Sequence, residues 1–318
     1  MKAAVVTRFG DTPRYVDAPE PVAVGEDEVV VDVLAAALSP RVRSQAAGSH
    51  YTSTADLPLI PGIDGVGRLP DGTLVYFLLP DTTRGAMAER VAIDRRRSVP
   101  LPSGADPVQV AAAMNPAMAS WVALRQRITV ERGQGVLVLG ATGNAGRAAV
   151  QVAHRLGAGA IVAVGRGVER MAGLAAQGAT RIVALDDDPD TVARNLAEAG
   201  KDVDVVLDFL WGEPASAALR AIVPNRVRDE QCLTWIQIGS VAGPESPIPS
   251  AALRAVNLRI IGSGQGSVEP RAYRQEIAAL AQEIHAGTFD TAARRVPLSE
   301  VESAWADTAS TERLVLVP

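Results

Sequence analysis

Residues 136–146 of the chain read VLVLGATGNAG, and this stretch decides the class of fold. Its four apolar residues, 136–139, predict a buried strand, and a helix is expected from Asn144 to Leu156, closed by Gly157. The turn between them matches the frame G-x-G-x-x-G with alanine at the first position. The second glycine of that frame lets the backbone approach a pyrophosphate, and the third lets the helix pack on the strand.

Placed between a strand and a helix, this turn predicts a dinucleotide site, because free N–H groups at a helix start attract phosphate. A tight turn without a ligand is the alternative reading. The predicted phosphate-binding residues are Ala141, Thr142, Gly143, Asn144, Ala145 and Gly146.

The chain continues as alternating strands and helices. Helices are expected at 168–177, where Gly178 ends the segment, and at 189–199. Apolar strands separated by single helices are typical of a parallel sheet with both faces covered, so an α/β fold with a Rossmann doubly wound sheet is predicted. The expected strands are 136–139, 160–164, 181–185, 203–208, 233–238 and 258–261.

The two ends of the chain have a different pattern. The first hundred residues contain β-branched and aromatic runs such as 29–34 and 73–78, interrupted by frequent prolines, and an alanine-rich helical stretch follows at 108–127. The tail should contain helices at 273–286 and 301–307, a short basic segment at 294–296 and a strand at 314–316. It is too small for a domain, so we expect a β-rich domain of residues 1–118 completed by 266–318, and a Rossmann domain of 119–265.

The end of the second strand predicts which cofactor is bound. Enzymes that select NAD usually carry an acidic residue at this tip, whereas this chain has Gly165 and Arg166. A guanidinium suits a 2′-phosphate, so NADP(H) is predicted, with Arg166 as selector and Arg170 in support. Alternatively, Arg166 is a solvated loop residue. The loops after two later strands are expected to line the cofactor, through Ile238, Gly239, Ser240, Ser263 and Gly264.

Composition excludes several classes of protein. The chain is 47% apolar and 21% charged, which allows a sizeable core, and its net charge of −5 argues against a general nucleic-acid binder. A single cysteine, Cys232, excludes an intrachain disulfide and a thiolate-rich zinc site, and three histidines lack ligand spacing. The longest nearly apolar run, residues 111–124, is too short to span a bilayer. No signal peptide is recognised, so a soluble, cytoplasmic protein without a membrane partner is expected.

The chain resembles the medium-chain dehydrogenase/reductase superfamily, specifically its zinc-free quinone oxidoreductase (zeta-crystallin-like) branch. The resemblance covers nearly the whole sequence. It implies a GroES-like β-rich domain, a Rossmann domain, a cleft between them, and a homodimer that pairs strand 258–261 across a two-fold axis. The motifs that carry it are MKAAVV at 1–6, PEP at 19–21, GEDEV at 25–29, Ser39-Pro40, PGIDGVG at 61–67 and the glycine turn.

Departures from the family pattern bear on the chemistry. Zinc-dependent members have a cysteine near the position of Ser39 and a His-Glu pair where this chain has Ile63-Asp64, so no metal is expected. Quinone reductases have Asn-Pro at the position of Ser39-Pro40 and a tyrosine near Ser44, where this chain again has serine.

The resemblance implies NADPH-dependent hydride transfer to a quinone or α,β-unsaturated carbonyl. A proton would then come from Tyr51, His50 or water, and Asn115, which interrupts an apolar segment, is a second candidate for the site. Packing or exposure of Tyr51 and backbone capping by Asn115 are the structural alternatives. A zinc-free alcohol or aldehyde reductase and a non-catalytic NADPH-binding or redox-sensing protein remain competing functions. Asp204 and Asp208, at the ends of a strand, receive no functional role.

Overall fold

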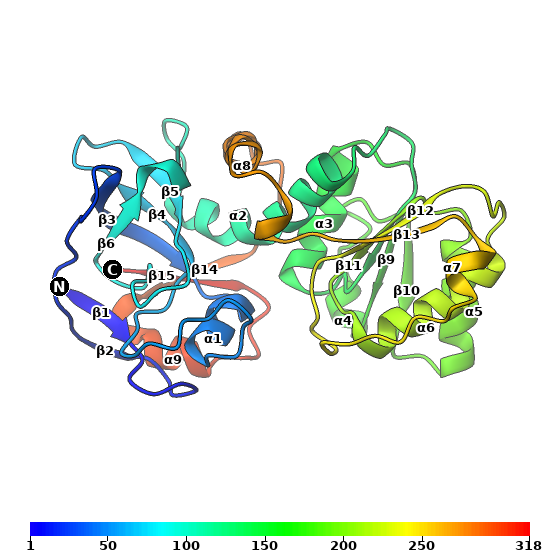
Figure 1. The fold of residues 1–318 in the computed structure, drawn as a ribbon, viewed down its shortest axis with the longest axis horizontal. Coiled ribbons are helices and arrows are strands. Elements are labelled where there is room, and N and C mark those ends of the chain that lie inside the picture. The colour runs from blue at the N-terminus through cyan, green and yellow to red at the C-terminus, as the bar shows by residue number, and fades with distance from the viewer. The chain divides into compact units, whose positions relative to one another are not determined.

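The computed structural model describes residues 1–318, which divide into two compact units (Figure 1). Unit 1 consists of Met1–Asn115 and Arg274–Pro318, and unit 2 consists of Pro116–Tyr273. The chain therefore leaves unit 1, forms unit 2 and returns to complete unit 1.

Unit 2 is built on a six-stranded parallel sheet. The strand order β10-β9-β8-β11-β12-β13 is the order 3-2-1-4-5-6 of a Rossmann fold, as the sequence predicted. The winding reverses between β8 and β11, and at such a switch point the loops after the strands leave room for a ligand. The strands are β8 (Val136–Leu139), β9 (Ile161–Gly165), β10 (Arg181–Ala184), β11 (Val205–Asp208), β12 (Leu233–Gln237) and β13 (Leu258–Gly262).

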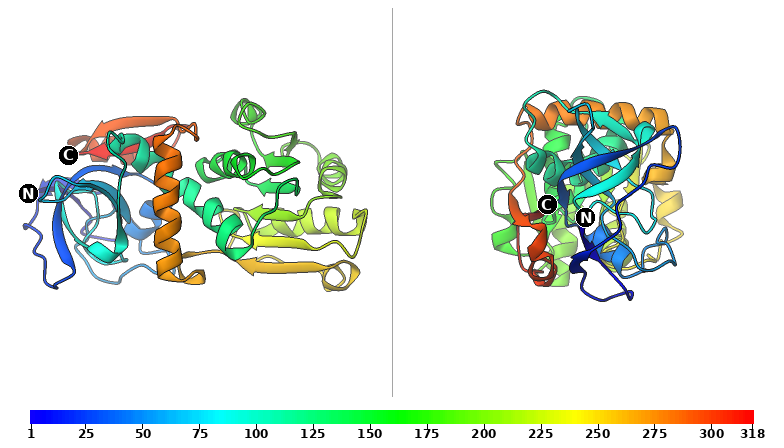
Figure 2. Two further views of the ribbon diagram at one scale, coloured as in Figure 1. Left: turned by 90° about the horizontal axis from the view of Figure 1, so that it is seen from above. Right: turned by 90° about the vertical axis from the view of Figure 1, so that its left-hand side faces the viewer.

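Helices cover both faces of this sheet (Figures 1 and 2). The helix α3 (Asn144–Arg155) packs on β8 and β9, while α5 (Pro189–Gly200) and α6 (Gly212–Ile222) pack side by side. One sequence prediction was wrong: the helix expected at 168–177 is only the single turn α4 (Val168–Met171). The chain leaves the helical conformation at Ala172, which has ψ of 137°, and Gly173 follows with φ of +84°. A further single turn, α7 (Ala252–Ala255), precedes β13.

Unit 1 contains a second, mostly antiparallel sheet of seven strands. Six follow the order β14-β15-β3-β4-β5-β7, and β6 pairs with β3. The pairing of β15 with β3 joins the end of the chain to its first hundred residues. The segment 294–296, expected only as a basic segment, lies in a strand. The strands are β3 (Glu28–Ala37), β4 (Asp64–Arg68), β5 (Leu74–Leu78), β6 (Arg90–Asp94), β7 (Ser98–Pro100), β14 (Ala293–Pro297) and β15 (Arg313–Val317).

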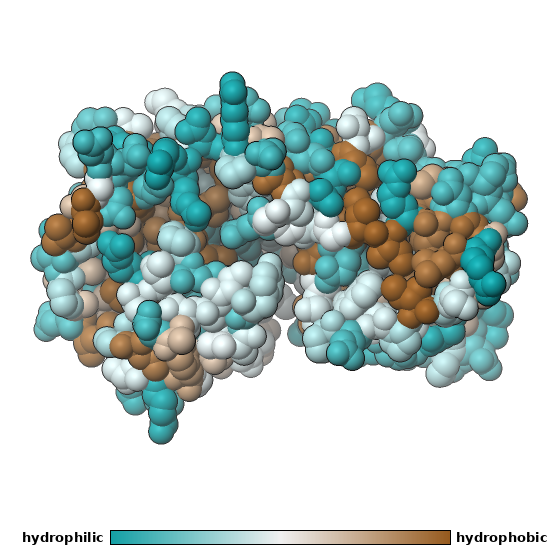
Figure 3. Space-filling view, viewed as in Figure 1, coloured by the Kyte–Doolittle hydropathy of each residue, from teal (hydrophilic) through white to brown (hydrophobic).

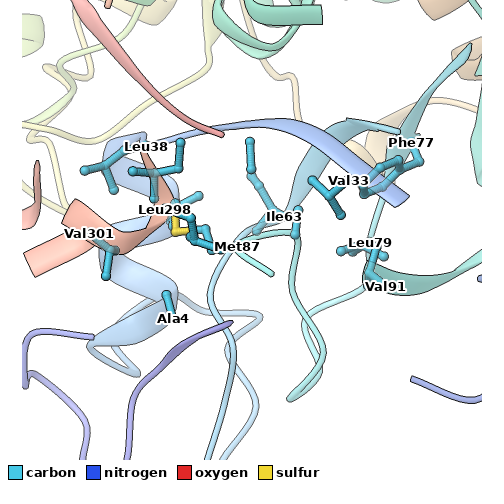
Figure 4. Packing of buried hydrophobic residues seen from close by; sticks show 14 of the residues in the cluster. Ala4, Val33, Leu38, Ile63, Phe77, Leu79, Met87, Val91, Leu298 and Val301 are labelled. Carbon is cyan, nitrogen blue, oxygen red and sulfur yellow. The ribbon is translucent and has the colours of Figure 1, made fainter. Parts of the chain in front are cut away.

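The core of unit 1 lies against this sheet. Figure 4 shows Leu38, Ile63 and Met87 packed with Leu298 and Val301 from the tail. Because these residues come from both chain segments of the unit, neither segment can bury its apolar side chains alone. A separate pair, β1 (Lys2–Val5) and β2 (Arg14–Asp17), completes the strands of the unit.

Three of the remaining helices were predicted and are present with small shifts of their ends: α2 (Pro107–Val122), followed by a π-helical turn at Ala123–Arg127, α8 (Pro270–His285) and α9 (Val301–Ala306). The fourth, α1 (Pro40–Ala46), was not predicted. None of the helices combines the length and apolar character needed to cross a membrane.

Candidate functional site

The glycine turn connects β8 to α3 at the point where the sheet changes direction. Its tight bend is made by Gly140, with φ of +98°, and not by Ala141, which is fully buried. A Cβ atom on Gly146 would lie 2.1 Å from the carbonyl oxygen of Gly140, so the helix start packs directly on the turn. A Cβ on Gly143 would meet nothing closer than 3.9 Å, which leaves this backbone open to a ligand. Gly146 is thus needed for close packing of the helix, whereas binding of a pyrophosphate at Gly143 stays a prediction. Gly140, which makes the bend, lies outside the predicted frame.

The first turn of α3 has no side-chain cap. Gly143 is the N-cap, so the N–H groups of Asn144, Ala145 and Gly146 follow it in the first helical turn and have no partner within the helix. Such groups, together with the helix dipole, favour an anion such as a pyrophosphate.

The tip of β9 lies beside this turn. Gly140 N and Ala141 N both donate to the carbonyl of Val164, at 2.9 Å. A Cβ on Gly165 would lie 2.6 Å from Cγ2 of Thr142, so glycine is required there by a side chain of the phosphate-binding turn. Thr142 therefore supports the tip of β9, a role the sequence did not reveal.

Two arginines with unpaired guanidinium groups follow this tip in the chain. Arg166 and Arg170 are exposed, and neither side chain takes part in a hydrogen bond or ion pair. Sequence reasoning missed Arg147, in the first turns of α3, whose guanidinium donates to the backbone carbonyl of Arg170. Arg147 directly follows the last glycine of the turn, and this position could have indicated that it lies near the predicted phosphate site.

An acidic residue also lies at this tip. The carboxylate of Asp186 accepts a hydrogen bond from the N–H of Gly167, at 2.5 Å. Asp186 follows β10 in the chain. Because the carboxyl ends of parallel strands meet at one edge of a sheet, its place after a predicted strand could have indicated that it lies near the tip of β9. The tip of β9 therefore combines unpaired positive charges with one carboxylate.

The predicted loops after β12 and β13 lie at the same edge of the sheet. Ile238 N and Gly239 N donate to the carbonyl of Asp208, and a Cβ on Gly239 would lie 2.8 Å from the carbonyl oxygen of Phe209. After β13, Ser263 N donates to the carbonyl of Gln237, and Gly264 N donates to the Ser267 hydroxyl. Ser240 and Gly264 are exposed. The structure thus brings all the predicted cofactor residues to the carboxyl edge of one sheet.

Asp208 organises the centre of this edge. Its buried carboxylate accepts N–H groups from Leu210, Trp211 and the Trp235 indole, each at 2.9 Å. Burial raises the pKa of Asp208 against the opposing effect of these hydrogen bonds. The loop held by Asp208 lies close to the glycine turn. A Cβ atom placed on Gly140 would be 3.0 Å from Cδ2 of Leu210, which belongs to this loop.

The two catalytic candidates lie on α2 and in the loop after α1. Tyr51 is 86% exposed, and its ring lies 4.3 Å from that of His50. Burial, together with the charge of Arg41, lowers the pKa of His50, while Asp81 opposes the shift. Asn115 is half-buried on α2, directly before Pro116, which interrupts the helical hydrogen bonds.

A buried ionic group occupies the position of the family's His-Glu pair. Asp64 accepts a 2.6 Å hydrogen bond from the Tyr76 hydroxyl and lies near Arg313, which donates to the carbonyl of Leu38 at 3.2 Å. Burial raises the pKa of Asp64 to about 6, although Tyr76 and Arg313 both act to lower it. Burial also lowers the pKa of Arg313. No three His, Cys, Asp or Glu side chains come together in a group that could hold a metal ion.

Comparison with curated proteins decides the family. The chain is 31% identical to the probable NADPH-dependent quinone reductase tdiC of Emericella nidulans over 361 aligned positions, which cover all of both chains. This chain belongs to the quinone oxidoreductases of the medium-chain dehydrogenase/reductase superfamily. The resemblance inferred from the sequence is thereby confirmed, and with it the assignment as an oxidoreductase.

Solved structures agree with this family. A quinone oxidoreductase of Thermus thermophilus, known also in complex with NADPH, is 28% identical and superposes with a TM-score of 0.78 over all of both chains. A mycobacterial quinone oxidoreductase, 21% identical, has the same fold with a TM-score of 0.85 over the full length of both chains. A scan against models of protein families finds no match.

Proposed function

We propose that this quinone oxidoreductase transfers hydride from NADPH to quinones and related α,β-unsaturated carbonyl compounds without a metal ion. The observation that carries the proposal is the open glycine turn of unit 2, flanked by the unpaired guanidinium groups of Arg166 and Arg170. The relative from Thermus thermophilus, which has been solved with NADPH, supports the choice of cofactor.

In this proposal the residues of unit 2 divide the cofactor between them. The N–H groups at the start of α3 bind the pyrophosphate, with Gly143 leaving space for it. Gly165, Arg166 and Arg170 bind the 2′-phosphate, since guanidinium groups form charge-assisted hydrogen bonds with phosphate oxygens. The loops after β12 and β13 bind the nicotinamide half, through Ile238, Gly239, Ser240, Ser263 and Gly264.

NADPH, when bound, supplies the hydride, and the protein supplies orientation and stabilises the charge that develops on the substrate oxygen. We propose that Tyr51 and Asn115 contribute from unit 1. A phenol and a carboxamide can both donate a hydrogen bond to an oxyanion, and the high exposure of Tyr51 leaves its hydroxyl accessible to a substrate.

Titration of the protein with NADPH and with NADH, followed by fluorescence, tests the cofactor site. Replacing Arg166 by alanine should weaken NADPH binding by about 10- to 100-fold, the effect of losing a charge-assisted hydrogen bond, and leave NADH binding unchanged. Arg194→Ala, on the exposed surface of α5, is the matched control. Equal affinity for both cofactors would remove Arg166 from this role and direct attention to Asp186, whose carboxylate suits a ribose hydroxyl.

Turnover with a panel of 1,4-quinones, simple enones and alcohols separates the competing functions. Reduction of quinones or enones, lowered in Tyr51→Phe or Asn115→Ala, supports the proposal. Oxidation of alcohols with NADP would support a zinc-free alcohol or aldehyde reductase. NADPH binding without turnover on any member of the panel would support a non-catalytic, redox-sensing role.

We further propose that the protein is a cytoplasmic homodimer. The strand β13 is an edge of the parallel sheet, and Figure 3 shows a hydrophobic patch over β13 and α7. Leu253 and Val241 are large hydrophobic residues exposed in this part of the chain. Light scattering should give a dimer mass for the wild type and a monomer mass for Val241→Glu/Leu253→Glu.

The proposed cytoplasmic location rests on the single cysteine of the chain, which suits a reducing compartment. Fractionation of the source cells would test this location.

A further inference from the structure

The tip of β9 has a carboxylate beside it that the proposed cofactor site does not use. The sheet itself brings this group, Asp186, to the tip. In the parallel pairing of β9 with β10, Gly165 lies opposite Ala184, and Leu185 N donates to the carbonyl of Gly165 at 2.8 Å. Continued beyond the strands, the same register brings Asp186 beside Gly167. The carboxylate therefore lies next to residues predicted to bind the 2′-phosphate.

Asp186 uses one of its two carboxylate oxygens and leaves the other free. Its Oδ2 accepts a hydrogen bond from the N–H of Gly167, at 2.5 Å, whereas Oδ1 has no hydrogen-bond partner. The side chain is exposed and forms no ion pair with Arg166 or Arg170. Because the backbone contact restrains the carboxylate, a free acceptor oxygen and an unneutralised negative charge stay at this tip.

The two cofactors differ in the group that they would bring to this tip. The 2′-phosphate of NADPH is an anion, so it suits guanidinium donors and is repelled by a carboxylate. The 2′-hydroxyl of NADH can donate a hydrogen bond, so it suits a carboxylate oxygen. A tip that selected NADPH alone would present donors alone, whereas this tip presents donors together with a free carboxylate oxygen.

Asp186 also occupies a donor that a phosphate could use. Successive backbone N–H groups in turns are common phosphate ligands. The N–H of Gly167 directly follows Arg166 in the chain, and it is already bound to Asp186. A 2′-phosphate at this tip would lack that donor or displace the carboxylate. Charge and hydrogen bonding therefore both act against NADPH.

We propose that Asp186 lowers the preference of this protein for NADPH, so that NADH also binds, by donating its ribose 2′-hydroxyl proton to the free carboxylate oxygen. Arg166 and Arg170 keep NADPH the preferred cofactor. This role rests on the proposed function, because it concerns the same cofactor site. All the residues involved belong to unit 2.

Fluorescence titrations with NADPH and, separately, with NADH measure this preference in the wild type and in Asp186→Asn. The asparagine oxygen can still accept from Gly167, so the variant removes the charge and keeps the loop contact. The Kd for NADPH should fall about fivefold, the scale of one repulsion between exposed charges. The Kd for NADH should rise about fivefold, because the ribose hydroxyl loses a charged acceptor. Asp190→Asn, in the first turn of α5, removes the same charge as a matched control and should change neither Kd.

Two further measurements separate the effect of the charge from structural damage. ADP-ribose and its 2′-phosphate lack the nicotinamide ring, so their Kd values report the adenosine end of the site alone. In Asp186→Asn these values should move in the same directions as those for NADH and NADPH. The gain in NADPH affinity should also shrink at high salt, because salt screens the repulsion. Damage to the site would weaken the binding of both cofactors.

An unchanged ratio of the two Kd values in Asp186→Asn, or a ratio shifted toward NADH, would overturn the role of Asp186 and leave the proposed function standing. A wild type that binds NADPH but not NADH would do the same. Asp186→Ser, which also removes the charge, takes the place of the asparagine variant if that variant fails to fold. A wild type that binds neither cofactor would instead overturn the proposed function, and the role of Asp186 with it.

Discussion

At the scale of single residues, close contacts between distant positions decide which side chains the cofactor site accepts. Gly165 ends β9 and Thr142 belongs to the turn after β8, yet a Cβ on residue 165 would lie 2.6 Å from Cγ2 and 3.4 Å from Cβ of Thr142. The clash that excludes alanine at position 165 therefore comes from Cγ2 and Oγ1 of Thr142, because the distance to Cβ of Thr142 is an ordinary contact.

Gly165→Ala should therefore destabilise the protein by about 1–3 kcal/mol, the usual cost of overpacking. Thr142→Ala removes Cγ2 and Oγ1, so adding it to Gly165→Ala should restore most of that loss. Urea unfolding of both single variants and the double variant measures the coupling between the two sites. Additive effects would mean that the backbone conformation, and not Thr142, requires glycine.

A second residue-scale prediction concerns pH. Burial raises the pKa of Asp64 from 3.8 to about 6, so the folded protein binds this proton more tightly than the unfolded chain does. The resulting stabilisation is complete below about pH 3.8 and is lost as the pH rises through about 6. Between pH 4 and 7, the free energy of unfolding should fall by up to about 3 kcal/mol because of this carboxyl group.

Asp64→Asn isolates this effect, since the amide does not titrate. The difference in free energy of unfolding between the wild type and Asp64→Asn should shift against the wild type as the pH rises from 4 to 7. Urea titrations at half-unit intervals of pH measure it. A difference that stays constant, or that moves in favour of the wild type, would show that Arg313 keeps the carboxylate ionised throughout.

At the scale of elements, Asp208 fixes the connection from β11 to α6. Leu210 N and Trp211 N donate to one oxygen of the carboxylate, and the Trp235 indole donates to the other. An asparagine has only one acceptor oxygen, so its amide N–H groups would face at least one of these donors. The same connection holds Trp211 at a φ of +54°, a conformation that non-glycine residues rarely adopt.

Asp208→Asn should lower the free energy of unfolding by about 1–3 kcal/mol, and it should weaken NADPH binding because the loop contacts Gly140. Asp204→Asn, next to the start of the same strand, is the control. Its carboxylate accepts from Gly135 and from the Gln231 amide, and the unpaired Oε1 of Gln231 can accept from an asparagine if that amide rotates. Urea unfolding and NADPH titration of both variants should separate them, and equal losses would argue against the loop-fixing role.

At the scale of the whole molecule, unit 1 is built from two separate chain segments. Leu316, fully buried on β15, belongs to the core that also contains Leu38 and Ile63. Because β15 pairs with β3 and with β14, the last residues of the chain are needed to close this sheet.

Leu316→Asp places a carboxylate in that core, so unit 1 should unfold at much lower urea than in the wild type. Hydrogen exchange should show loss of protection in β3 and β4 while β8 and β11 keep theirs. Val227→Asp, at a position that is 60% exposed in unit 2, is the control. Simultaneous loss of protection in both units would mean that they unfold as one cooperative body.

The sequence by itself determined the parallel sheet, the glycine turn and the family. Strand runs such as 136–139 are apolar throughout because both faces of the sheet are covered, and that pattern is local in the chain. The same local character explains the error at 168–177, where composition favoured a helix but Gly173 adopts a positive φ.

Tertiary structure alone decided the details of the candidate sites. It brought Thr142 against Gly165, the Asp186 carboxylate to Gly167, and Asp81 to the guanidinium of Arg41. These partners are 19 to 40 positions apart, and no periodicity links them. Their contacts arise from how strands and loops pack, which depends on the whole arrangement of the chain and not on the residues nearby in sequence.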